Sequence, residues 1–108
     1  MSMPTPKSSN WSAVEDRQPP GARLTVKGLI TTTNSNQVPH LTKTNPQGSN
    51  PTILLLDLSI TAEGVGSTVL GEREVQYRET IKASQYTSVE IQYEGQRLET
   101  IDHIEVVR

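Results

Sequence analysis

The chain has 108 residues, a net charge of −2 and no cysteine. This length suits one domain, and the absence of cysteine excludes a disulfide framework, a cysteine–metal site and a thiol nucleophile. No cluster of Lys and Arg with interleaved aromatic residues occurs, so the sequence argues against nucleic-acid binding.

The sequence predicts a cytoplasmic protein that does not enter a membrane. The first residues contain no apolar stretch that could serve as a signal peptide. The longest apolar run, Ile53 to Leu56, is far too short to span a bilayer. Small secreted domains also tend to rely on disulfides, which this chain cannot form.

Residues 1–21 are predicted to form a disordered N-terminal arm. Prolines stand at positions 4, 6, 19 and 20, and no apolar periodicity runs through the segment. Trp11, the one tryptophan, lies in this arm. It is interpreted as an exposed aromatic residue or one folded over an apolar patch; the alternative is an anchor for a partner's pocket.

From Ala22 the apolar residues recur at every second position, which is the pattern of β-strands. Gly28 falls on the apolar side of the first strand and indicates a bulge or close packing. The segment around Glu94-Gly95 is predicted to form a hairpin turn. In the last strand Ile101 is out of phase, which a bulge near residues 100–102 would explain. The predicted strands cover residues 22–30, 38–43, 52–61, 72–81, 86–94 and 98–107.

This pattern predicts an all-β fold with one domain over residues 22–108. About six strands, each apolar on one face, have to bury those faces against one another. The predicted architecture is a small antiparallel two-sheet sandwich, and the alternative is an open β-barrel.

Three stretches resemble a family of small bacterial proteins of similar length that has no assigned activity. They are the turn at Pro46–Pro51, the run Leu54–Leu58 that follows it, and the stretch Glu74–Tyr77. These are turn and core residues, so the resemblance supports the sandwich and implies no site residue.

The sequence predicts no catalytic residue, no metal ligand and no cofactor. No potential nucleophile lies in a recognisable catalytic motif, and neither do the two histidines, His40 and His103. Asp102 and His103 are neighbours, and neighbours on a strand point to opposite faces. Asp57 is the one carboxylate within the most apolar strand and thus the best candidate for a perturbed pKa, although a solvent-facing position is favoured.

The favoured function is a non-enzymatic binding module whose partner is a protein. Long polar loops on a rigid sandwich, or an exposed strand edge, would make the contacts. One alternative is a small-ligand or metal-dependent enzyme with His40, His103 or Asp57 at an oligomer interface. The other is a structural subunit of a homo-oligomer. The predicted binding residues are Trp11, Asn34, Asn36, Gln37, Asn45, Gln47 and Asn50.

Overall fold

The computed structural model describes residues 6–108, which contain eight β-strands. The strands are β1 (Ser8–Asp16), β2 (Ala22–Asn34), β3 (Gln37–Lys43), β4 (Ile53–Ala62), β5 (Thr68–Ile81), β6 (Ser88–Tyr93), β7 (Gln96–Ile101) and β8 (Glu105–Val107). All six predicted strands are therefore present, and the last of them is divided into β7 and β8.

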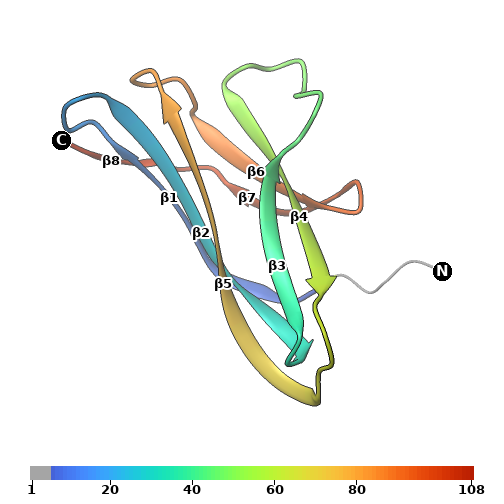
Figure 1. Cartoon of the computed structure of the whole chain (residues 1–108). Coiled ribbons are helices and arrows are strands. Elements are labelled where there is room, and N and C mark those ends of the chain that lie inside the picture. The colour runs from blue at the N-terminus through green and yellow to red at the C-terminus, as the bar shows by residue number, and fades with distance from the viewer. Residues whose placement is uncertain (1–5) are drawn as a thin grey trace.

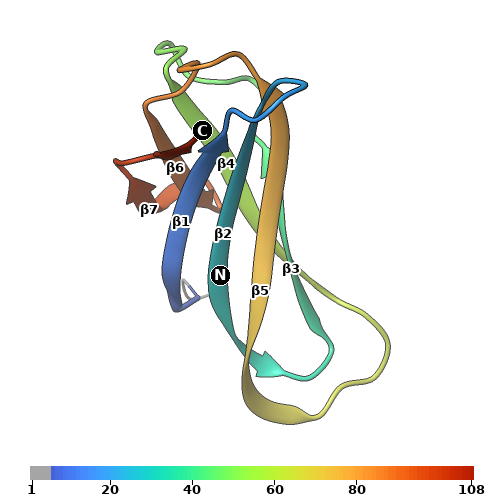
Figure 2. The same cartoon turned by 90° about the vertical axis from the view of Figure 1, so that its left-hand side faces the viewer.

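The strands form two four-stranded sheets that pack face to face (Figures 1 and 2). The strand order is β5-β2-β1-β8 in one sheet and β3-β4-β6-β7 in the other. The two-sheet sandwich is confirmed, and the sheets do not close into a barrel. Two pairings, β1–β8 and β4–β6, are parallel. Between β4 and β6 the chain crosses to the other sheet to form β5.

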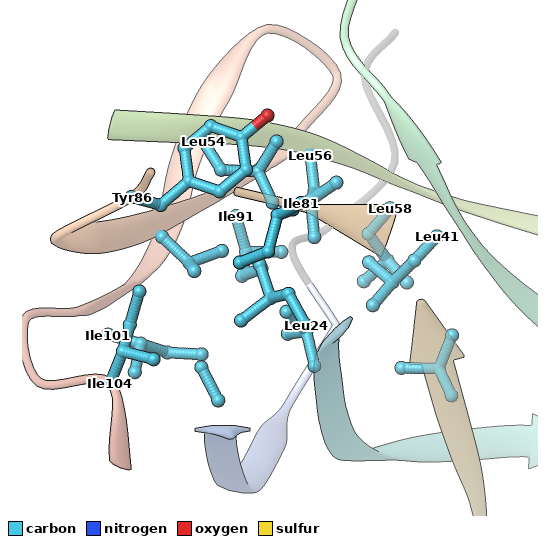
Figure 3. Close-up of a cluster of buried hydrophobic side chains, with 14 of the residues drawn as sticks. Leu24, Leu41, Leu54, Leu56, Leu58, Ile81, Tyr86, Ile91, Ile101 and Ile104 are labelled. Carbon is cyan, nitrogen blue, oxygen red and sulfur yellow. The ribbon is translucent and has the colours of Figure 1, made fainter. Parts of the chain in front are cut away.

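The core lies between the two sheets and is built by alternate residues of the strands. Along β2 and β4 every second side chain is buried, so the two-residue period follows the inner faces. Figure 3 shows side chains from both sheets, such as Leu24 and Leu56, gathered in this layer. The largest apolar side chains with no more than 1% exposure are Leu24, Val26, Ile30, Leu54, Leu56, Val89 and Ile91.

The prediction of a disordered arm over residues 1–21 is wrong for Ser8–Asp16, which form β1 between β2 and β8. The inner face of β1 carries Trp11, Ala13 and Glu15. Ala13 is small and Glu15 is charged, so these inward positions do not show the alternation of large apolar residues by which the other strands were predicted. The part of the predicted arm formed by residues 1–5 lies outside the described residues.

Trp11 lies in a bulge of β1 and covers Gly28 of β2. The register shifts between Ser9 and Ser12, so that Asn10 and Trp11 both lie opposite Gly28. Asn10 has a φ of 55°, and Trp11 Nε1 donates a hydrogen bond to Ser8 Oγ at 2.9 Å. The side chain of Trp11 is half-buried against the core, which agrees with the interpretation that it folds over an apolar patch.

The C-terminal hairpin explains the phase change that the sequence shows. Glu94 and Gly95 have φ values of 50° and 79° and connect β6 to β7, which confirms the predicted turn. The register slips at Leu98 rather than near residues 100–102. The chain then leaves its sheet after Ile101, and β8 pairs with β1 in the other sheet.

We expect Gly28→Ala to lower the free energy of unfolding by about 1–3 kcal/mol, because overpacking forces neighbouring side chains away. A methyl group on Gly28 would overlap the indole ring of Trp11 at Cε3. Urea unfolding followed by Trp11 fluorescence measures the effect. The matched control is Gly21→Ala, where a methyl group meets nothing within 4 Å. Equal effects of the two substitutions would contradict this account of the bulge.

Candidate functional site

The predicted binding residues are divided between the two ends of the sandwich. Antiparallel pairing of β3 with β4 places the turn before β3 and the loop after it at opposite ends, as Figure 1 shows. Asn34, Asn36 and Gln37 therefore lie at one end, which we call the lower end. Asn45, Gln47 and Asn50 lie at the other, the upper end, and Trp11 lies on β1. The structure does not bring these residues together into one site.

At the lower end the polar side chains hold two loops together. Gln37 Oε1 accepts hydrogen bonds from the backbone N–H groups of Thr33 and Asn34 at 2.7 and 3.2 Å. Asn36 Nδ2 donates to the carbonyl oxygen of Gly64 at 3.2 Å. The backbone N–H of Ser35 donates to Ser67 O at 2.9 Å. The bonds of Gln37 lie within the β2–β3 turn. Those from Asn36 and Ser35 connect this turn to the β4–β5 loop.

At the upper end Gln47 pairs with the backbone of β4 as another strand would. Its Nε2 donates to Leu55 O at 2.9 Å, and its Oε1 accepts from Leu55 N at 2.9 Å. The same Nε2 also donates to Thr44 O at 2.6 Å. Asn50 Oδ1 accepts from the backbone N–H of Thr52 at 3.0 Å. Gln47 and Asn50 thus order the β3–β4 loop.

We expect Gln47→Ala to destabilise the fold by about 1–3 kcal/mol, because the half-buried Leu55 N–H and Thr44 carbonyl lose the partner that Gln47 provides. The Leu55 carbonyl keeps its hydrogen bond from Thr44 N–H. The neighbouring control is Asn45→Ala: Asn45 is exposed and forms no side-chain hydrogen bond among the described residues, so a change within about 0.5 kcal/mol is expected. Thermal unfolding of both variants measures the difference. A cost for Asn45→Ala as large as that for Gln47→Ala would contradict the role given to Gln47.

The residues considered for catalysis lie apart from one another. His40 Nε2 is 3.0 Å from Thr61 Oγ1 on the outer face of the sheet. Asp57 lines a shallow cavity of about 570 Å³ together with Ser59 and Gln92. His103 lines two smaller cavities near the break between β7 and β8. Within residues 6–108 no group of three or more His, Asp or Glu side chains could hold a metal ion.

Glu15 is a buried carboxylate that no pattern in the sequence marks as buried. It is 1% exposed and forms an ion pair with Arg17. The backbone N–H of Ser84 donates to both carboxylate oxygens, at 3.2 and 3.3 Å. Arg17 Nη2 donates to Ser84 Oγ at 2.6 Å. These contacts tie β1 to the β5–β6 loop, so the charge of Glu15 is used within the fold.

A second polar cluster joins the edge strands of the two sheets at the upper end. Tyr77 and Tyr86 donate to the carboxylate of Glu79 at 2.6 and 2.8 Å. Lys43 Nζ lies 3.2 Å from Glu79 Oε1. Burial acts to raise the pKa of Glu79, but the hydrogen bonds from Tyr77, Tyr86 and Lys43 outweigh it, and the pKa is lowered. Burial and the hydrogen bond to Glu79 raise the pKa of Tyr77.

We expect this cluster to stabilise the fold in a pH-dependent way. The folded-state pKa of Glu79 lies below its ordinary value of 4.5. The stabilising contribution is therefore complete above that value and is lost as the pH falls through the folded-state pKa. Urea unfolding from pH 7 to pH 3 should show a smaller acid-induced loss of stability for Glu79→Gln than for the unmodified chain. Parallel pH profiles would contradict the assignment. Glu99→Gln, on exposed β7, is the control and should leave the profile unchanged.

The free edge of β5 is the candidate interaction site. Among the described residues β5 pairs with β2 alone, and Figure 2 shows it at the edge of its sheet. Every side chain from Thr68 to Glu74 is exposed. Two of them are apolar: Val69 is 51% and Leu70 is 79% exposed. They lie in a bulge, because both are opposite Thr33 of β2.

The chain matches no protein-family model, no curated protein and no solved structure. The resemblance to small bacterial proteins therefore stays a prediction. None of the described residues belongs to a helix that is long and apolar enough to cross a membrane.

Proposed function

We propose that this chain is a non-enzymatic protein-interaction module that binds an extended protein segment as an additional strand along β5. The observation that carries the proposal is the edge of β5 (Thr68–Ile81), which within residues 6–108 pairs with no strand on its second side. The edge is fully exposed from Thr68 to Glu74, and β3 of the other sheet packs near it at Tyr77 and Glu79. An edge strand offers a row of unpaired N–H and C=O groups to any chain that can lie beside it.

The other edge strands offer less to a partner. β8 is 3 residues long, and β7 is 6 residues long. β3 contains Pro39, which lacks the N–H needed for a ladder. β5 has 14 residues and no proline. Length favours β5, because each added residue pair contributes further backbone hydrogen bonds.

The polar loop residues support the same assignment indirectly. Gln37 and Asn36 hold the lower loops, and Gln47 and Asn50 hold the upper loop. Their side chains therefore have internal partners that a ligand would have to replace. A partner that covers the exposed apolar side chains of Val69 and Leu70 breaks no internal hydrogen bond, and the burial of their surface favours binding. A cytoplasmic location remains part of this proposal and is supported by the lack of cysteine.

A photo-crosslinking amino acid placed at Leu70 tests the proposal in cells that produce the protein naturally. We expect discrete protein adducts, and mass spectrometry should locate the crosslink in an extended segment of the captured chain. A synthetic peptide of that segment should then shift the amide NMR signals of β5. Leu70→Lys should weaken the binding of the peptide about tenfold, because it places a charge in the interface.

The control carries the same crosslinker at Arg97, which is exposed on the short edge strand β7. Adducts should be specific to Leu70. If both positions capture the same set of proteins, or if Leu70 captures none, strand addition at β5 is refuted.

A further inference from the structure

We infer that the segment that pairs with β5 is β5 of a second copy of this chain, in an antiparallel register centred on Val75. This inference rests on the proposed function and names its partner. The two copies would form one continuous eight-stranded sheet across the dimer, with a two-fold axis through the pair Val75↔Val75.

The charges along β5 carry the inference. Around Val75 this register places Glu72 opposite Arg78 and, by symmetry, Arg78 opposite Glu72. Opposite charges directly across a strand pair are favourable, and like charges are not. No two like charges face each other in this register: Glu74 lies opposite Gln76, and Arg73 lies opposite the aromatic ring of Tyr77. The sequence of β5 is therefore complementary to itself.

Registers shifted toward the N-terminal side of Val75 lack this complementarity. A register centred on Glu74 places that carboxylate opposite its own copy. A register centred on Arg73 places that guanidinium opposite itself and Glu72 opposite Glu74. The register centred on Gln76 also places opposite charges across the pair, Glu74 against Arg78 and Arg73 against Glu79. Arg73 and Glu79, however, already have partners within the chain.

Those partners are defined within the chain. Arg73 Nη2 donates to Ser35 O at 2.8 Å. The carboxylate of Glu79 accepts from Tyr77 and Tyr86 and pairs with Lys43. The register around Val75 uses neither group for an ion pair, so it breaks none of these contacts.

The groups that this register does use are available. Glu72 and Arg78 are exposed, and neither belongs to an ion pair among the described residues. Arg78 lies opposite Thr25 and Glu72 opposite Thr31 on β2, so neither faces an opposite charge on that strand. Beyond Gly71 the register also brings the exposed Val69 and Leu70 to the end of β5 of the second copy, near Thr80, where the apolar surface of these two side chains would leave water.

Charge exchange tests both the partner and the register. Sedimentation velocity over micromolar to millimolar concentrations should show a monomer–dimer equilibrium for the unmodified chain. Glu72→Arg and Arg78→Glu should each weaken the dimer about tenfold or more, because each replaces two attractions by two repulsions. The double variant E72R/R78E should restore the dimer. An equimolar mixture of the two single variants should also restore it, as a heterodimer.

Matched charge changes outside the interface are the controls. Glu63→Arg, in the β4–β5 loop, and Arg97→Glu, on β7 of the other sheet, alter exposed positions off the β5 edge and should leave the equilibrium unchanged. Circular dichroism confirms that each variant keeps its strands.

A chain that stays monomeric at every concentration would overturn the inference, and so would single variants that neither the double exchange nor the mixture rescues. The crosslinking at Leu70 separates this failure from that of the proposed function. Adducts with a different protein but not with a second copy would leave strand addition standing and refute the dimer. The absence of any adduct would refute strand addition itself.

Discussion

The structure depends on burying the inner faces of two sheets against each other. In β2 and β4 alternate side chains are removed from water, and these strands lie inside their sheets with neighbours on both sides. Burial of apolar area is the main favourable contribution to folding, and a domain of this size has little of it to spare. The position of every other element follows from covering this layer. β1 and β8 extend the cover on one sheet, and β6 and β7 extend it on the other.

Polar side chains serve this architecture more than they serve a pocket. The amides of Gln37 and Gln47 take the place of backbone partners at loops. The carboxylates of Glu15 and Glu79 each pair with a cationic side chain and also accept a hydrogen bond from the β5–β6 loop. A buried or half-buried polar group is costly unless it is paired, so these contacts are constraints on loop position. Side chains committed in this way are poorly suited to bind a ligand without loss of stability.

The edge of β5 differs from these polar groups, because its backbone N–H and C=O groups have no strand partner among the described residues. The strand is long, lacks proline and carries two exposed apolar side chains beside alternating charges. Proteins commonly protect such edges with charges and bulges, and β5 has both. Glu72 and Arg78, however, carry opposite charges and lie at equal distances along the strand on either side of Val75. The same side chains that discourage pairing with an arbitrary strand therefore favour pairing with a second copy.

The sequence by itself determined the fold class, because a two-residue apolar period has one physical meaning: a sheet with one face hidden. It also placed six strand segments and the turn at Glu94-Gly95, where local conformation decides the structure. It did not reveal β1, since Ala13 and Glu15 acquire their inward positions only from β2 and the β5–β6 loop. The division of the polar loops between two ends, the packing of Trp11 on Gly28 and the free edge of β5 were likewise decided by the tertiary structure. Each depends on which strands become neighbours in space, and the periodicity of a single strand carries no information about its neighbours.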